Sequence, residues 1–114
     1  MNSMIEVFQL IDDQISLQRK MIAFCIISSF KKGQSINFHE LNERTRNLAA
    51  NKSKKSKDFN FQMFNPNFTR KDMEFVLSKL IKNRVIIKDV GREIYKLADE
   101  INNVGEIKYE KLGL

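Results

Sequence analysis

The 114-residue chain contains one cysteine, one proline, one histidine and no tryptophan. A single cysteine excludes an internal disulfide framework and fits a reducing compartment. Cys25 and His39 together cannot supply the four ligands of a typical zinc site, so we expect no metal and no cofactor. They are also the only candidates for a nucleophile and its base. Because Cys25 lies in an apolar run, where burial makes a thiol inert, we expect it to pack in the core.

Further signatures of enzymes and membrane proteins are missing. No glycine belongs to a P-loop or a dinucleotide fingerprint, and the carboxylates do not form a cluster. The longest uninterrupted apolar run, Met21–Ile27, is far shorter than the ~20 residues that span a bilayer. The N-terminus carries acidic residues where a signal peptide carries basic ones. We expect a soluble, intracellular, non-enzymatic protein without a small-molecule ligand.

What the chain has in excess is basic charge, 20 Lys and Arg against 14 Asp and Glu, net +6. Residues 1–15 carry three acidic and no basic side chains, and residues 99–114 carry four acidic and two basic ones. Residues 16–98 between them carry 18 basic and seven acidic side chains. A basic excess on so small a chain favours DNA, RNA or an anionic membrane as partner. A membrane is disfavoured, because no basic amphipathic helix with a free apolar face remains once the core is assigned.

The first third of the chain predicts two helices and a strand stub. Apolar residues favour a short helix over 4–11, and Ser16 is a plausible N-cap for a second helix from Leu17 to Phe30. That helix is apolar on nearly its whole circumference, which is typical of a helix sandwiched in a core. Lys31, Lys32 and Gly33 are a helix stop signal, and Ser35–Phe38 is long enough only for a short strand.

The middle of the chain predicts two more helices around a loop. Asn37, with Glu40 three residues later, predicts an N-cap for a helix whose apolar stripe reaches Ala49. Residues 50–67 are expected to form a long loop. Thr69 and Asp72 mark the start of the next helix, and its apolar residues follow the helical period most clearly: Met73, Val76, Leu77, Leu80 and Ile81.

Two β-rich runs, 85–88 and 93–97, surround a turn that contains Gly91 and predict a hairpin. The tail from Ala98 is mixed, with a short helix expected near 99–104. This order of elements predicts a mainly α fold with a small β-hairpin (α+β), a winged helix-turn-helix. We expect a winged-helix domain at 16–98, an apolar and acidic segment at 1–15 that suits a dimerisation helix, and a tail at 99–114.

In this fold the third helix of the winged-helix domain, which begins at Thr69, enters the major groove. Residues 88–92 form the tip of the wing. At 100° per residue, Phe75 falls on the outward face of the third helix, where it meets a thymine methyl group or a protein partner. The candidate DNA contacts on that helix and on the wing are Arg70, Lys71, Phe75, Ser78, Lys79, Lys82, Lys88 and Arg92. An ordinary solvated helix face is the alternative to DNA contact.

A lysine run precedes a group of phenylalanines in the expected loop. Lys52, Lys54, Lys55 and Lys57 suit either non-specific phosphate contact or a solubilising loop. The phenylalanines suit either a stacking platform for unpaired bases or the anchoring of the loop onto the core. They are Phe59, Phe61, Phe64 and Phe68.

Four segments of the chain resemble the C-terminal winged helix of the origin-recognition and Cdc-type replication initiators. The resemblance covers roughly residues 16–104, with a longer link at 50–67 than that family has. The chain is similarly close to TubR-type centromere-binding proteins and to small MarR-like repressors, which act as dimers. The segments that carry the resemblance are Leu17–Cys25, Ile36–Leu41, Phe68–Ile86 and Gly91–Leu97.

The resemblance implies a protein that binds double-stranded DNA, in the nucleoid or the nucleus. Origin binding, plasmid partition and transcriptional control stay open, as does a winged helix that docks on a larger protein assembly. Binding of RNA or single strands through the phenylalanines is a third alternative. A homodimer is expected through apolar residues near the two ends, namely Ile5, Phe8, Ile11, Ile101, Val104 and Ile107.

Overall fold

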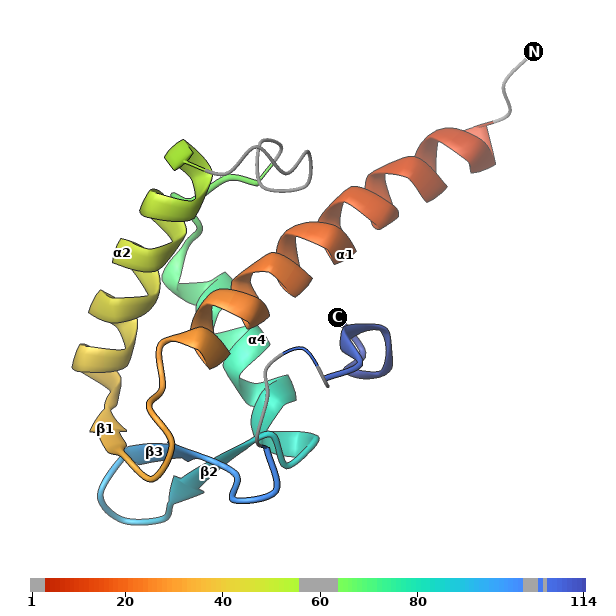
Figure 1. The fold of residues 1–114 in the computed structure, drawn as a ribbon. Helices are drawn as coiled ribbons and strands as arrows, with labels where there is room; N and C mark the ends of the chain where they lie inside the picture. Colours follow the sequence, from red (N-terminus) through yellow and green to blue (C-terminus); the bar gives the residue numbers. More distant parts are fainter. Residues whose placement is uncertain (1–3, 56–63, 102–104, 106) are drawn as a thin grey trace.

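The computed structural model describes residues 4–55, 64–101, 105 and 107–114, with residues 4–13 and 55 described by their backbone alone. The fold is mainly helical with a small antiparallel sheet, and so belongs to the α+β class (Figure 1). Its elements are α1 (Met4–Ser28), β1 (Ser35–Asn37), α2 (Phe38–Lys55), α4 (Arg70–Lys82), β2 (Ile86–Asp89), β3 (Ile94–Leu97) and the 3₁₀ helix η2 (Tyr109–Lys111).

The predicted strand stub and the predicted hairpin join into one sheet with the strand order β1-β3-β2. Tyr95 in the central strand pairs with Ile36 of β1 on one side and with Lys88 of β2 on the other. Since α2 begins directly after β1, the sheet places the hairpin beside the first turn of α2 (Figure 1). The predicted hairpin is confirmed, and its turn contains Gly91 at φ +117°, a backbone angle that favours glycine.

The second half of α1 forms the centre of the core, as its apolar circumference predicts. Ile22, Ile26 and Ile27 are completely buried, and α1 packs against both α2 and α4. Each fully buried aliphatic side chain contributes roughly 1.5–3 kcal/mol to folding. The apolar stripe of α4 faces this helix, with Met73, Val76, Leu77 and Leu80 all buried.

The expected helix start at Ser16 is wrong, because α1 runs without a break from Met4 to Ser28. No glycine or proline interrupts this stretch, so nothing in the backbone ends the first helix before the second begins. Ser16 Oγ instead donates a hydrogen bond to the carbonyl oxygen of Leu114 at 2.8 Å. The helix ends at Ser28, ahead of the expected last turn at Lys31 and Lys32, and Gly33 lies in the turn that follows, at φ +79°.

The sequence predicts the start of α2 correctly but not its end. Its start is confirmed, because Asn37 Oδ1 accepts a hydrogen bond from the backbone N–H of Glu40 at 2.8 Å. Its end is not, because the helix continues through Lys55, whereas the sequence predicts a loop from Ala50. Completely buried Ala49 anchors this last part, and the polar residues beyond it include good helix formers.

The start and the end of α4 are both held by local hydrogen bonds. Thr69 Oγ1 accepts from the backbone N–H of Asp72 at 3.1 Å, which confirms the predicted N-cap. At the other end Arg84 adopts φ +60°, its N–H donates to the Ile81 carbonyl, and the Val85 N–H donates to the Leu80 carbonyl. These two bonds form a Schellman motif, which turns the chain from α4 into β2.

The C-terminal segment, residues 107–114, packs against the core of its own chain. Leu112 is buried, Tyr109 packs against Phe24 of α1, and Ile101 and Ile107 pack against the core. Ile101 and Ile107, which the sequence places at a dimer interface, are half-buried against the core of their own chain, and Val104 lies outside the described residues. Asp99–Ile101 are not helical, and residues 102–104 of the expected helix lie outside the description. Among the described helices, none has both the length and the apolar character that crossing a membrane requires.

Candidate nucleic-acid interface

The solvent face of α4 carries the exposed side chains of Lys71, Ser78 and Lys82. They lie within about 40° of one another on the helix, opposite the buried stripe. Ser78 Oγ donates to the Phe75 carbonyl at 2.6 Å, so its lone pairs remain as acceptors for an external donor. This face therefore presents two ammonium groups and a hydroxyl to whatever lies against the helix.

Phe75 does not belong to this face, and its predicted outward position is wrong. The ring is half-buried and packs against the core. The guanidinium of Arg19, on α1, lies 4.2 Å from the ring centre, and Lys79 Nζ lies 5.5 Å from it. Cations are attracted to the face of an aromatic ring, so Phe75 and half-buried Lys79 belong to the α1 side of α4.

On the opposite side of α4, a groove of about 310 Å³ separates the helix from the hairpin. Arg70 and Glu74 of α4 line it, and their side chains pair through Nε and Oε1 at 2.8 Å. Lys88 and Glu93 line it from the hairpin. Because Arg70 also lies 5.1 Å from the ring centre of Phe38, the first turn of α2 closes one end of the groove.

A second hollow, of about 460 Å³, continues from this groove toward α2. Arg70 lines both hollows, and Arg92 adds a second guanidinium to the larger one. His39 and Asn42, on the first turn of α2, complete its polar lining. Sequence reasoning missed both residues, although a polar pair spaced i, i+3 directly after an N-cap lies on one face of a helix start.

Together these residues form one continuous polar surface over α4, the hairpin and the start of α2. It contains five basic and two acidic side chains and no buried charge. We call it the candidate interface, defined by His39, Asn42, Arg70, Lys71, Glu74, Ser78, Lys82, Lys88, Arg92 and Glu93.

No protein-family model, curated protein or solved structure matches this chain. The candidate interface therefore rests on its own geometry and chemistry. Its members come from three elements that are far apart in the sequence, and the packing of α2, α4 and the sheet brings them together.

The two arginines of α2, Arg44 and Arg46, are half-buried and bond to neighbouring parts of the protein. Arg44 donates to the side chains of Glu40 and Gln34, and so ties α2 to the turn that precedes β1. Arg46 donates to the Phe68 carbonyl at 2.7 Å, and its guanidinium lies 4.7 Å from the Phe68 ring centre. These arginines contribute to the net charge without contributing to the candidate interface.

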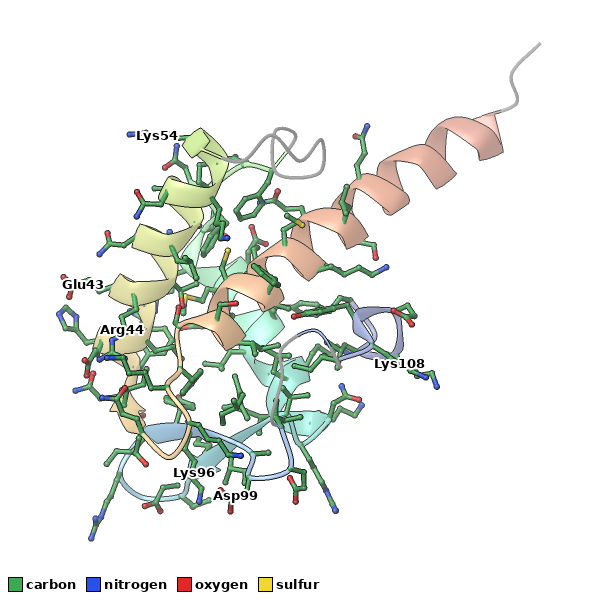
Figure 2. The ribbon with its side chains drawn as sticks, in the orientation of Figure 1. Glu43, Arg44, Lys54, Lys96, Asp99 and Lys108 are labelled. Carbon is green, nitrogen blue, oxygen red and sulfur yellow. The ribbon has the colours of Figure 1, made fainter. Side chains whose placement is uncertain are left out.

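The predicted lysine run lies on the end of α2 that is farthest from the hairpin, where Figure 2 shows Lys54. Lys52 and Lys54 are exposed and helical, Lys55 is described by its backbone alone, and Lys57 lies outside the described residues. The run is therefore separate from the candidate interface.

The predicted phenylalanine platform is wrong for the members that are described. Phe64 and Phe68 are buried, and their ring centres lie 6.1 Å apart. They anchor the segment before α4 on the core, which is the alternative that the sequence left open. Phe59 and Phe61 lie outside the described residues.

Two interior side chains in the described part of the chain have raised pKa values, those of Cys25 and Tyr109. Burial raises the pKa of the Cys25 thiol to about 11, despite the opposing charge of Lys52, and so keeps the thiol protonated and unreactive near neutral pH. Burial likewise raises the pKa of Tyr109 to about 12. Among the residues that the structure describes, no group of three or more His, Cys, Asp or Glu side chains is placed to hold a metal ion.

Proposed function

We propose that this chain is a winged helix-turn-helix protein that binds double-stranded DNA without catalysing a reaction. In this proposal α4 is the recognition helix and the β2–β3 hairpin is the wing. The observation that carries it is the candidate interface, a continuous basic surface whose centre is the exposed face of α4. An α-helix with its side chains fits the major groove of B-DNA, and flanking basic residues contact phosphates on either side.

Each part of the candidate interface has a role in this proposal. Lys71 and Lys82 lie about 17 Å apart along α4, at 1.5 Å per residue, and suit phosphates on the two sides of one groove. Ser78, between them, is the residue of α4 best placed for a base edge. Lys88 and Arg92 flank the tip of the wing, where they suit phosphates or an adjacent minor groove.

The start of α2 provides a further phosphate contact. The first N–H groups of a helix and its macrodipole favour an anion at this end. His39 and Asn42 add side-chain donors there, beside Arg70 and Arg92 in the same hollow. Because most of these groups suit phosphates, they position the protein more than they select a sequence. Origin binding, partition and transcriptional control all fit such a surface.

The alternative of a protein-docking winged helix loses three of the residues that suggested it, Phe64, Phe68 and Phe75. Phe75 is covered by Arg19, and Phe64 and Phe68 are buried in the core. The platform for single-stranded nucleic acid loses the same two buried phenylalanines. Duplex DNA is therefore the partner that the exposed chemistry supports best.

The experiment compares two triple variants that remove the same amount of charge. Lys71→Ala/Lys82→Ala/Lys88→Ala removes three cations of the candidate interface, and Lys31→Ala/Lys108→Ala/Lys111→Ala removes three exposed cations elsewhere; Lys108 lies on the C-terminal segment (Figure 2). Fluorescence anisotropy measures the affinity of each for a labelled duplex over a series of salt concentrations. Circular dichroism shows whether each variant is folded.

We expect the interface variant to bind duplex DNA at least about tenfold more weakly than the wild type. Its salt dependence should be shallower by about 0.9 in logarithmic slope for each phosphate that the variant no longer neutralises. The control variant should be affected much less. Equal weakening of the two variants would show that only net charge matters and would refute the assigned surface. A wild-type chain without salt-dependent affinity for a duplex would refute DNA binding and favour the protein-docking alternative.

A further inference from the structure

The chain contains one histidine, His39, whose side chain is 89% exposed on the first turn of α2. It lines the hollow of about 460 Å³ together with Asn42 of the same helix, Arg70 of α4 and Arg92 of the hairpin. The hollow therefore combines two permanently charged guanidinium groups with the only imidazole of the chain. An imidazole is the side chain that changes its charge between about pH 5 and pH 8.

Charged groups lie near His39 on three elements. On α2, Glu43 Oε2 lies 3.9 Å from His39 Nε2, which is beyond hydrogen-bond length but within the range of attraction between opposite charges. Figure 2 shows Glu43 on the solvent side of the helix. Arg70 of α4 lines the same hollow, as do Arg92 and Glu93 of the hairpin. The two carboxylates favour the imidazolium form, whereas the two guanidinium groups and the amino end of α2 oppose it.

A phosphate bound in the hollow would change this balance in one direction. Its negative charge offsets the two guanidinium groups that oppose the imidazolium, and it adds a second acceptor beside the Glu43 carboxylate. A neutral imidazole has a single N–H and donates to only one acceptor, whereas an imidazolium donates from both ring nitrogens. Two other carboxylates nearby are already paired with arginines, Glu40 with Arg44 and Glu74 with Arg70.

We infer that His39 binds a DNA phosphate as an imidazolium, so that the binding of a duplex takes up a proton from the solvent. This inference rests on the proposed function, because it takes duplex DNA as the source of the phosphate. A ligand whose binding takes up protons binds more tightly as the pH falls, by thermodynamic linkage. The affinity for DNA should therefore be higher in mildly acidic than in mildly alkaline solution.

The composition of the chain makes this pH dependence assignable to one residue. Carboxylates ordinarily titrate near pH 4, and lysines and tyrosines titrate near pH 10. Burial raises the pKa of Cys25, the single thiol, to about 11. The α-amino group titrates near pH 8, but it is present in every variant. Any dependence that is lost when His39 is replaced therefore belongs to its imidazole.

The test compares three variants with the wild type. His39→Gln removes the titrating group and keeps a polar side chain, and His39→Lys supplies a permanent positive charge. The matched control is the double variant His39→Gln/Asn51→His, which moves the single histidine to an exposed position about 18 Å further along α2. Circular dichroism shows whether each variant is folded.

Fluorescence anisotropy measures the affinity of each protein for a labelled duplex between about pH 5.5 and pH 8.0, at constant ionic strength. The duplex carries no terminal phosphate, because a phosphomonoester titrates near pH 6. We expect the wild type to bind about five- to tenfold more tightly at the acidic end of this range than at the alkaline end. His39→Gln and the double variant should change by less than about twofold.

Two further results are expected. His39→Lys should bind in alkaline solution about as tightly as the wild type binds in acidic solution. Calorimetry in two buffers of different ionisation enthalpy counts the protons that binding takes up. It should give about 0.4 proton per chain for the wild type near pH 7 and almost none for His39→Gln.

The same pH dependence in the wild type and in His39→Gln would overturn this inference. Full pH dependence in the double variant would also overturn it, because the effect would then come from net charge alone. In both cases the duplex still binds, so the proposed function would stand. A wild-type chain without affinity for a duplex at either end of the pH range would refute the inference and the proposed function together.

Discussion

Arg19 of α1 and Phe75 of α4 form a cation–π contact between the two helices, with 4.2 Å between the guanidinium and the ring centre. Lys79 approaches the same ring to 5.5 Å. The ring therefore links α1 to α4 and divides the surface of α4 into two parts. The side toward α1 is occupied by the protein, and the side toward the hairpin is open to a ligand.

This division predicts that Phe75 matters for stability and not for DNA. Phe75→Ala should lower the free energy of unfolding by about 2 kcal/mol, less than a fully buried phenylalanine would, because a half-buried ring makes fewer packing interactions. Its affinity for a duplex, measured on folded protein, should stay within about twofold of wild type. Urea denaturation and fluorescence anisotropy measure the two quantities. A large fall in affinity with unchanged stability would place Phe75 on the DNA side after all.

Removal of the negative charge of Glu74 should increase the affinity for duplex DNA. Its carboxylate lies in the candidate interface and pairs with Arg70 at 2.8 Å, so it both repels phosphate and occupies a guanidinium. Glu74→Gln should increase the affinity for duplex DNA about three- to tenfold at low salt. Stability should change by less than about 0.5 kcal/mol, because both side chains are exposed.

The matched control for Glu74 is Glu110→Gln, which removes one exposed acid from the C-terminal segment. It changes the net charge by the same amount and lies outside the candidate interface. An equal increase in affinity for the two variants would attribute the effect to net charge alone.

A buried hydroxyl pair predicts coupled effects on stability. Ser29 Oγ donates to the Cys25 carbonyl at 2.7 Å, so the hydrogen between Ser29 and Thr45, at 3.2 Å, comes from Thr45 Oγ1. Ser29→Ala leaves that buried donor without this acceptor and should cost about 1–3 kcal/mol. Thr45→Val removes the donor, so the double variant should be destabilised by less than the sum of the two single variants. Additive effects in urea denaturation would contradict the coupling.

Two raised pKa values predict a decline of stability in alkali. Burial raises the pKa of Cys25 from 9.0 to about 11 and that of Tyr109 from 10.0 to about 12. Between these limits the unfolded chain releases protons that the folded chain retains, so stability present below pH 9.0 is lost as pH rises through the folded values. Urea denaturation at a series of pH values measures this, and Cys25→Ala should flatten the decline. A free energy of unfolding that stays constant in this window would contradict the burial of both groups.

The sequence predicts the elements whose signals are local. The Asn37 and Thr69 caps, the apolar stripe of α4 and the glycine turn of the hairpin each involve residues within a few positions of one another, and the structure has all of them. The errors arise where a local signal competes with packing. Ser16 resembles an N-cap, yet the helix passes through it because Leu17 and the residues after it continue the same helical core.

The composition of the candidate interface is predictable from the sequence, but the side of α4 on which each residue lies is not. Helical phase places Phe75 next to Lys82 and opposite the core, but it carries no information about α1, whose Arg19 covers the ring. Phase also cannot show that His39 and Asn42 share a hollow with Arg92, about 50 positions away along the chain. These neighbours are set by the packing of α2 against α1 and by the pairing of β1 with β3.

The bond from Ser16 to Leu114 closes a loop of 98 positions. The contacts of α1 with α2, and of β2 with β3, join nearby parts of the chain and have low entropic cost. The surface of α1 around Phe24 is covered only when Tyr109 and Leu112 arrive. During synthesis, therefore, α1 retains an uncovered side until the segment around Tyr109 and Leu112 has left the ribosome.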